Sequence, residues 1–287
     1  PASPVCPHHS TRRASRSRAR LERWWVGEVG DFDAGVRTVA LRLRRGPGTD
    51  AAPGLTTVAV RRGSSASAVG TFEHDPTAET WAALGAAAEG LPPVPVLQTR
   101  GTVADAARVT ADFRDEYYAA AAAVREAGAA EGAGAAGEAP LITSGLLDCG
   151  RHAWGERAVR LAKRRYTRPV ADLGLLERSR PGWANARLVP KVLVATQTRV
   201  IEAASDSAGR LLPVTPVVSV LVNAEPAEAE AQTALLAAAL CSPVLSLLAR
   251  VRSWGTAMSP GVLKLSAAQI AALPVPAHVA AWRGAAA

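Results

Sequence analysis

Basic side chains interleaved with aromatic ones are concentrated in one stretch of the sequence, between residues 151 and 199. This stretch holds twelve Lys or Arg against three acids, a local net charge of +9, whereas the whole chain carries +8. Trp154, Tyr166 and Trp183 lie among these basic residues. Cationic side chains bind phosphates and aromatic rings stack on bases, so the pattern indicates a polyanionic partner, nucleic acid first.

The same charge also has an interpretation that needs no partner. The chain has thirty Arg but only three Lys, and it is rich in Ala, which is typical of a GC-rich coding sequence. Such a bias raises the Arg content everywhere, and the stretch could then be a solvated basic surface. The residues alone leave both interpretations open.

The candidate contacts to nucleic acid combine phosphate-binding and base-reading side chains. Arg clamps phosphate or bridges guanine O6 and N7, and Lys supplies a point charge. A strand is predicted over 191–196; Lys191 at its start is expected to face phosphate, and the loop after it could present Gln197 to adenine. Residues 197–199 could instead be an ordinary strand end with no role in base reading. Trp154 could instead be buried in the core. The candidates are Arg151, Trp154, Lys163, Arg164, Arg165, Arg168, Lys191, Gln197, Thr198 and Arg199.

The cysteines and the apolar segments of the sequence indicate the cellular compartment of the protein. Cys6, Cys149 and Cys241 are far apart in the sequence, which fits neither a disulfide framework nor a metal site and favours a reducing compartment. We interpret Cys149 as a buried, unreactive thiol. The sequence lacks an apolar run long enough to span a membrane and an apolar core of a secretory signal near its start. We therefore expect a cytoplasmic protein with no membrane partner.

The elements that must position these residues are of mixed type, which predicts an α+β fold. Residues 1–20 are rich in Ser and Arg and are predicted to be a disordered basic arm. Strands over 36–43 and 55–61 are predicted to pair antiparallel, and a helix over 76–91 follows. Because the sequence begins with Pro rather than Met, we expect it to be part of a longer protein.

Later elements are predicted on both sides of a Gly- and Ala-rich linker over 128–139, where we place a domain boundary. A helix is expected before it, over 105–127, because apolar residues recur there at helical spacing. After the linker we predict strands over 191–196, 214–222 and 263–265, a turn over 206–210, helices over 225–240 and 243–253, and a last short helix capped by Ser266.

The order of seven segments resembles the order found in one enzyme family. They are FRDEYY at 113–118, SGLLDCGRHAWGER at 144–157, RRYTRP at 164–169, PKVLVATQTRVIEA at 190–203, LPVTPVVSV at 212–220, SPVLSLLAR at 242–250 and LKLSAAQIAALPVP at 263–276. This order resembles the C-terminal portion of bacterial adenine-specific DNA methyltransferases of the N-6 DNA methylase, Taq-like gamma class.

The resemblance implies a division of the chain into functional parts. Residues 21–100 would be a remnant of the last strands and helix of an α/β catalytic domain. Residues 101–139 would be a helix and flexible linker, and residues 140–287 a mixed α/β target-recognition domain. The implied partner is double-stranded DNA, together with a separate catalytic half or a restriction subunit. The alternative is a non-catalytic protein-interaction or specificity subunit of a defence complex.

The resemblance also shows what this sequence lacks. The family binds S-adenosylmethionine through a Gly-rich turn and orients the target amine with an Asn/Asp-Pro-Pro-aromatic tetrapeptide. Here Leu91-Pro92-Pro93-Val94 has neither the amide or acid nor the aromatic ring. We therefore expect no catalytic, cofactor-binding or metal-binding residue in this chain, with S-adenosylmethionine implied only for the complete enzyme.

Overall fold

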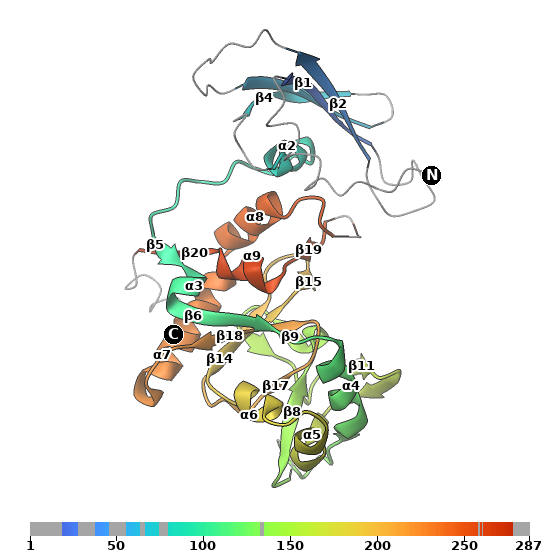
Figure 1. Ribbon diagram of the computed structural model, residues 1–287, viewed down its shortest axis with the longest axis vertical. Coiled ribbons are helices and arrows are strands. Elements are labelled where there is room, and N and C mark those ends of the chain that lie inside the picture. Colours follow the sequence, from blue (N-terminus) through green and yellow to red (C-terminus); the bar gives the residue numbers. More distant parts are fainter. Residues whose placement is uncertain are drawn as a thin grey trace. The chain divides into compact units, whose positions relative to one another are not determined.

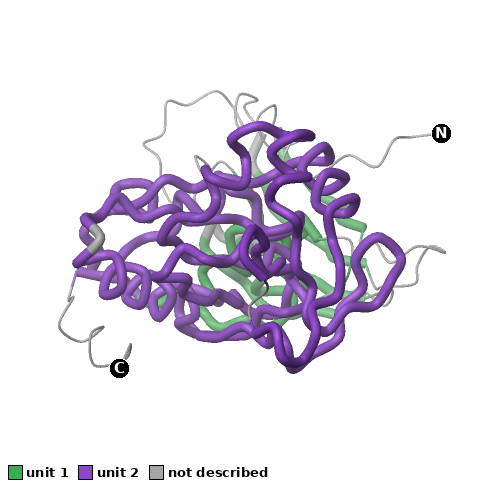
Figure 2. Tube along the Cα trace, turned by 90° about the horizontal axis from the view of Figure 1, so that it is seen from below, with its two compact units in different colours: residues 1–95, 247–264 green, residues 96–246, 265–287 purple. Residues whose placement is uncertain are grey.

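The computed structural model describes residues 19–27, 38–45, 56–63, 67–74, 80–132, 135–257, 259 and 261–277. These residues form an α+β protein, as the sequence predicts (Figure 1). The chain divides into two compact units (Figure 2): unit 1 comprises 1–95 and 247–264, and unit 2 comprises 96–246 and 265–287. The predicted basic arm lies outside the described residues up to position 18, and Ala19 already begins a strand.

Unit 1 contains a four-stranded sheet with the order β2-β1-β3-β4. The predicted strands over 36–43 and 55–61 are confirmed as β2 and β3, but their direct pairing is wrong. A further strand, β1, lies between them, antiparallel to β2 and parallel to β3. The strands are β1 (Ala19–Val26), β2 (Val39–Arg45), β3 (Thr56–Arg62) and β4 (Ser67–His74).

The core of unit 1 packs the helix α2 (Ala82–Ala88) against one face of this sheet. Trp24 is buried among Leu21, Val26, Leu84 and Ala88, and its ring lies 5.2 Å from that of Trp254. The predicted helix over 76–91 is therefore confirmed as α2, but it is shorter than predicted, since the described residues 80–81 and 89–91 are not helical. Trp24, Trp81 and Trp254, which are far apart in the sequence, thus pack with aliphatic side chains in one core.

A glycine inside α2 makes room for this tryptophan. A Cβ atom placed on Gly85 would lie 2.2 Å from the ring of Trp254. We expect Gly85→Ala to lower the free energy of unfolding by about 1–3 kcal/mol, because overpacking outweighs the gain in helix propensity of about 1 kcal/mol. Urea unfolding followed by tryptophan fluorescence measures this change. The control is Ala83→Gly, at a neighbouring exposed position of the same helix. It should lower the free energy of unfolding only by the difference in helix propensity between Ala and Gly. A more stable Gly85→Ala protein would contradict this packing.

Unit 2 is built around two further four-stranded sheets. In the first, β14 is buried along its whole length between β16 and β18, and β6 pairs with the other edge of β18. In the second, β13 lies between β7 and β8, and β17 pairs with β8. The strands are β6 (Ala107–Ala111), β14 (Lys191–Ala195), β16 (Ala203–Asp206), β18 (Val217–Val222), β7 (Val124–Glu126), β8 (Glu138–Ile142), β13 (Pro169–Asp172) and β17 (Leu212–Pro213).

Short elements and helices complete the described chain. The helices are α3 (Val103–Ala106), α4 (Arg114–Ala123), α5 (Leu173–Ser179), α6 (Trp183–Arg187), α7 (Pro226–Leu240), α8 (Pro243–Arg252), α9 (Ala267–Ala271) and the 3-10 turn η1 (Ser144–Leu146). The short strands are β5 (Thr99–Thr102), β9 (Leu147–Asp148), β10 (Arg151–His152), β11 (Val159–Leu161), β12 (Arg164–Tyr166), β15 (Gln197–Thr198), β19 (Leu263–Lys264) and β20 (Pro274–Pro276).

Two predictions about residues 101–139 are wrong. The single helix expected over 105–127 is instead α3, β6, α4 and β7, because Val109 and its neighbours pair with β18. Ala-rich segments have a high helix propensity, but propensity is only a weak preference and this tertiary pairing overrides it. The segment 128–139 is not a domain boundary, because β7 before it and β8 after it both pair with β13 in one sheet.

Most predictions for the C-terminal half are confirmed. The strands β14 and β18, the helices α7 and α8 and the turn at Gly209 occur where the sequence indicates, although β18 begins at Val217. The Ser266 side chain accepts a hydrogen bond from the Gln269 N–H and so caps α9. Among the described residues, no single helix is long and apolar enough to span a membrane; α7 and α8 pass that test only together, with a 59° bend.

Candidate nucleic-acid interface

The basic run at 160–165 forms a β-hairpin. The strands β11 and β12 pair antiparallel, and Leu161 opposite Arg164 closes a two-residue turn. Both turn residues have positive φ, 49° at Ala162 and 68° at Lys163, as the twist of a tight hairpin requires. Gly or Asn usually occupies such positions, so two L side chains here cost conformational energy. The turn places Lys163 at the tip of the hairpin.

The two faces of the hairpin have opposite character. Val159, Leu161 and Tyr166 are buried in the core clusters of unit 2 and hold the hairpin in place. On the solvent side, Arg160 lies directly opposite Arg165, and like charges in such a cross-strand pair destabilise a sheet. The exposed cations Arg160, Lys163, Arg164 and Arg165 form no ion pair with any acid that the structure describes.

Three of the predicted contacts have structural partners instead. Arg151 is exposed but pairs with Glu156 at 2.9 Å and with Asp148 at 3.5 Å, so two acids already lie beside its charge. Trp154 packs on the core and donates its indole N–H to the Pro169 carbonyl at 2.8 Å, which favours the core interpretation. Arg168 is half-buried, and its guanidinium donates to the Ala129 carbonyl.

The expectation that Lys191 faces phosphate is wrong. Its side chain is 0% exposed and its Nζ lies 2.5 Å from Oδ2 of Asp206, which is also buried. Asp206 pairs with Lys191 across the β14–β16 ladder, a juxtaposition that the strand pattern alone does not indicate. Burial lowers the pKa of the Lys191 amine, and the carboxylate of Asp206 opposes that effect. Lys191 therefore belongs to the fold of unit 2.

The residues after β14 reach the surface, as the sequence predicts. Gln197 and Arg199 are exposed, and Arg199 has no ion-pair partner within the described chain. Thr198 is half-buried, and its hydroxyl donates to the Val200 carbonyl. Gln197 and Arg199 therefore remain candidates for reading bases, whereas the hydroxyl of Thr198 already has an acceptor.

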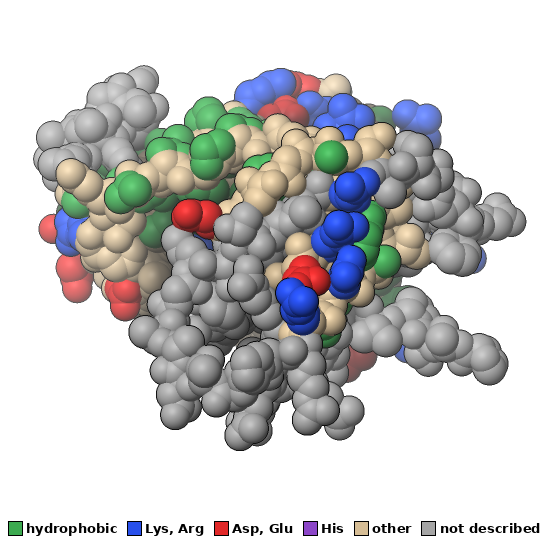
Figure 3. Space-filling view, turned by 90° about the horizontal axis from the view of Figure 1, so that it is seen from above, with side chains coloured by type: hydrophobic (Ala, Val, Ile, Leu, Met, Phe, Trp, Pro, Cys, Tyr) green, Lys and Arg blue, Asp and Glu red, His purple; other side chains and the backbone are tan. Residues whose placement is uncertain are grey.

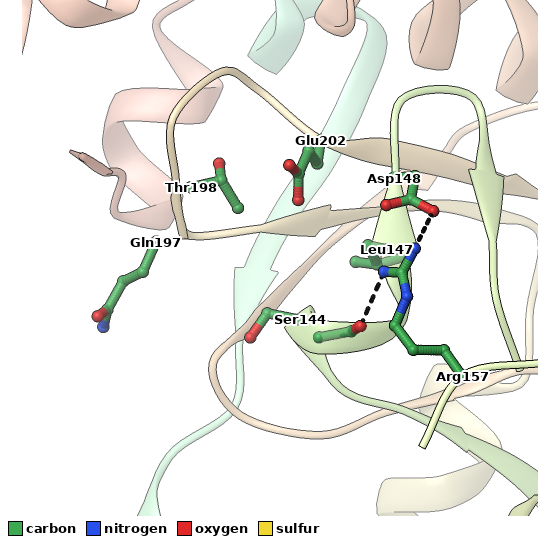
Figure 4. A pocket seen from close by; sticks show the side chains of 8 residues that line it. Ser144, Leu147, Asp148, Arg157, Gln197, Thr198 and Glu202 are labelled. Carbon is green, nitrogen blue, oxygen red and sulfur yellow. Dashed lines mark hydrogen bonds and ion pairs between the residues drawn. The ribbon is translucent and has the colours of Figure 1, made fainter. Parts of the chain in front are cut away.

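A hollow of about 380 Å³ lies between this loop and the β9 region (Figure 4). Gln197 and Thr198 lie on one side, and Arg157 lies on the other, where it donates to Asp148 at 2.6 Å and to the Gly145 carbonyl at 3.1 Å. Glu202 lies between the two sides. The sequence-based choice of residues missed Ser144, Asp148, Arg157 and Glu202, because no local spacing relates them.

The charges in the hollow influence one another. The hydrogen bond from Arg157 lowers the pKa of Asp148. Burial raises the pKa of Glu202, and the negative charge of Asp148 adds to this effect. The hollow therefore offers the carboxylates of Asp148 and Glu202, and the Gln197 amide on the side away from Asp148. Groups of this kind form hydrogen bonds with the polar edges of bases.

Unit 1 has a basic surface of its own, on the solvent face of its sheet. Arg23, Arg42 and Arg44 are exposed there, and Glu22 pairs with both Arg42 and Arg44 at 3.4 Å. Figure 3 shows Lys and Arg side chains gathered around an acidic one on one side of the molecule. This surface has an acid among its cations, whereas the hairpin of unit 2 has none within ion-pairing distance in the described chain. The positive charge of the hairpin is therefore balanced less by nearby acids than that of the unit 1 surface.

Comparison with known proteins does not assign a family to this chain. No protein-family model and no curated protein matches the sequence. The resemblance to adenine-specific DNA methyltransferases therefore stays a prediction that depends on the seven segments alone.

The segment Leu91-Pro92-Pro93-Val94, which has the two prolines of the tetrapeptide expected from the resemblance, lacks the groups that methyl transfer would need. Leu91 is half-buried, and Pro92 and Pro93 are exposed in an extended segment after α2. Neither Leu91 nor Val94 has a group that could accept a hydrogen bond from an adenine amine or stack on its ring. These four residues therefore could not orient a target adenine, and we derive no methyl-transfer step from them.

Proposed function

We propose that unit 2 binds double-stranded DNA and that the β11–β12 hairpin makes its main phosphate contacts. The observation that carries the proposal is the Arg160–Arg165 pair, two like charges held opposite each other by a buried hairpin. This arrangement costs stability in the isolated protein, and the phosphates of a duplex would offset that cost. A two-stranded ribbon is also narrow enough to enter the major groove.

The sequence resemblance extends the proposal to a biological role. The chain would be the target-recognition portion of an adenine-specific DNA methyltransferase, with the methyl donor bound by another part of the enzyme. Phosphate contacts position a protein on DNA, and contacts to base edges select the sequence. Gln197 and Arg199, exposed beside the hollow, are then the candidates for base reading.

Binding of the purified chain to a duplex oligonucleotide tests the proposal. We expect fluorescence anisotropy to detect binding at low salt, with an affinity that falls as salt rises. Four hairpin cations on phosphates correspond to a slope of about −3.6 in log affinity against log salt. An absence of binding at the lowest salt concentration would contradict the proposal, and a slope near zero would exclude phosphate contacts as its basis.

A further inference from the structure

Two cysteines that are far apart in the sequence meet on one edge of unit 2. The Cys149 thiol donates to the Ile201 carbonyl at 3.4 Å, and the Cys241 thiol donates to the Ala203 carbonyl at 3.3 Å. The carbonyl between these two, that of Glu202, accepts from Ala195 instead. Successive carbonyls of an extended segment point in opposite directions, so those of Ile201 and Ala203 face the same way.

The backbone around the two thiols holds them together. The N–H of Gly150 donates to the same Ala203 carbonyl at 2.8 Å and fixes the turn that carries Cys149. Cys241 ends α7, and its own N–H donates to the Ala237 carbonyl at 2.9 Å. Burial raises the pKa of Cys241 to about 11, and the neighbouring Cys149 adds to this effect.

The two thiols differ in their access to solvent. Cys149 is exposed, whereas Cys241 is partly buried. The sequence-based interpretation of Cys149 as a buried thiol is therefore wrong. In an arrangement of this kind, the exposed thiol attacks the disulfide of the oxidant and the less accessible thiol then resolves the mixed disulfide.

We propose that Cys149 and Cys241 form a reversible disulfide by exchange with a low-molecular-weight disulfide such as glutathione disulfide. The Cys149 thiolate attacks one glutathione sulfur, the S–S bond of glutathione breaks, and the first glutathione leaves and takes up a proton. Cys241 then attacks the Cys149 sulfur, gives its proton to the second glutathione and displaces it. Two protein thiols are oxidised, and one glutathione disulfide is reduced to two thiols.

The disulfide would join the turn after β9 to the end of α7. It would lie near the hollow, because Asp148 and Glu202 line the hollow and are the sequence neighbours of Cys149 and Ile201. A cross-link between such distant positions restricts the unfolded chain strongly. We therefore expect the oxidised protein to melt about 5 °C or more above the reduced protein. The inference does not depend on DNA binding.

The test uses the full chain with Cys6→Ser, which leaves Cys149 and Cys241 as its cysteines. The protein is incubated under native conditions in buffers of increasing glutathione disulfide, and its thiols and mass are measured. We expect both thiols to be lost together, with no glutathione retained and with one peptide pair cross-linked through residues 149 and 241. Retention of glutathione on Cys149 beside a free Cys241 would overturn the proposal.

Single serine variants separate the two steps. With Cys241→Ser, we expect a mixed disulfide to accumulate on Cys149, and the rise in melting temperature to disappear. With Cys149→Ser, the thiol of Cys241 should react at least about ten times more slowly, because it is partly buried and its pKa is raised. Equal reactivity of the two thiols would contradict the assigned order of attack.

Discussion

Replacing Lys191 with Met is expected to lower the free energy of unfolding by about 3–5 kcal/mol. The variant keeps the length of the side chain but removes its charge, and Asp206 then remains buried without its counter-ion. Two backbone donors would stay in place, since the Asp206 carboxylate also accepts from the N–H groups of Arg210 and Leu211 at 3.0 and 2.9 Å. These bonds alone do not replace an ammonium at 2.5 Å.

Urea unfolding followed by circular dichroism measures this loss. Lys264→Met is the matched control, because Lys264 is exposed in a short strand and its replacement should change stability by less than about 0.5 kcal/mol. The double variant Lys191→Met with Asp206→Asn should recover part of the loss, since it removes the unpaired charge. A loss of less than about 1 kcal/mol in the single variant would mean that Lys191 is not buried against Asp206.

Removing three hairpin cations together is expected to weaken DNA binding by about 150- to 2,000-fold at low salt. The variant is Lys163→Ala, Arg164→Ala and Arg165→Ala, and each charge-assisted contact contributes about 1–1.5 kcal/mol. The slope of log affinity against log salt should become shallower by at most about 2.7. Fluorescence anisotropy across a salt series measures both quantities.

A second triple variant separates this interface from net charge. Arg23→Ala, Arg42→Ala and Arg44→Ala remove the same charge from the sheet of unit 1, and we expect a much smaller loss of affinity. Equal losses in the two variants would mean that binding follows overall charge and not the hairpin. The hairpin variant should also be no less stable than the parent protein, because it relieves the repulsion between Arg160 and Arg165.

Local sequence determined the elements whose signals are strong and self-contained. The β-branched runs at β14 and β18 predict buried strands, and a proline near the start of α7 and a serine cap on α9 mark helix starts. The concentration of charge between residues 151 and 199 is likewise visible in the sequence. These features depend on side-chain shape, capping and composition, which neighbouring residues fix by themselves.

Tertiary structure decided which of the charged and polar residues are free to act. Lys191 and Arg165 both lie in a basic stretch, but only the fold places Asp206 against the first and Arg160 against the second. The same holds for β6, whose pairing with β18 replaced the predicted helix, and for Cys149, whose neighbour lies 92 positions further along the chain. Contacts over such separations contribute more than local propensities of under about 1 kcal/mol per residue, and no spacing within the sequence records them.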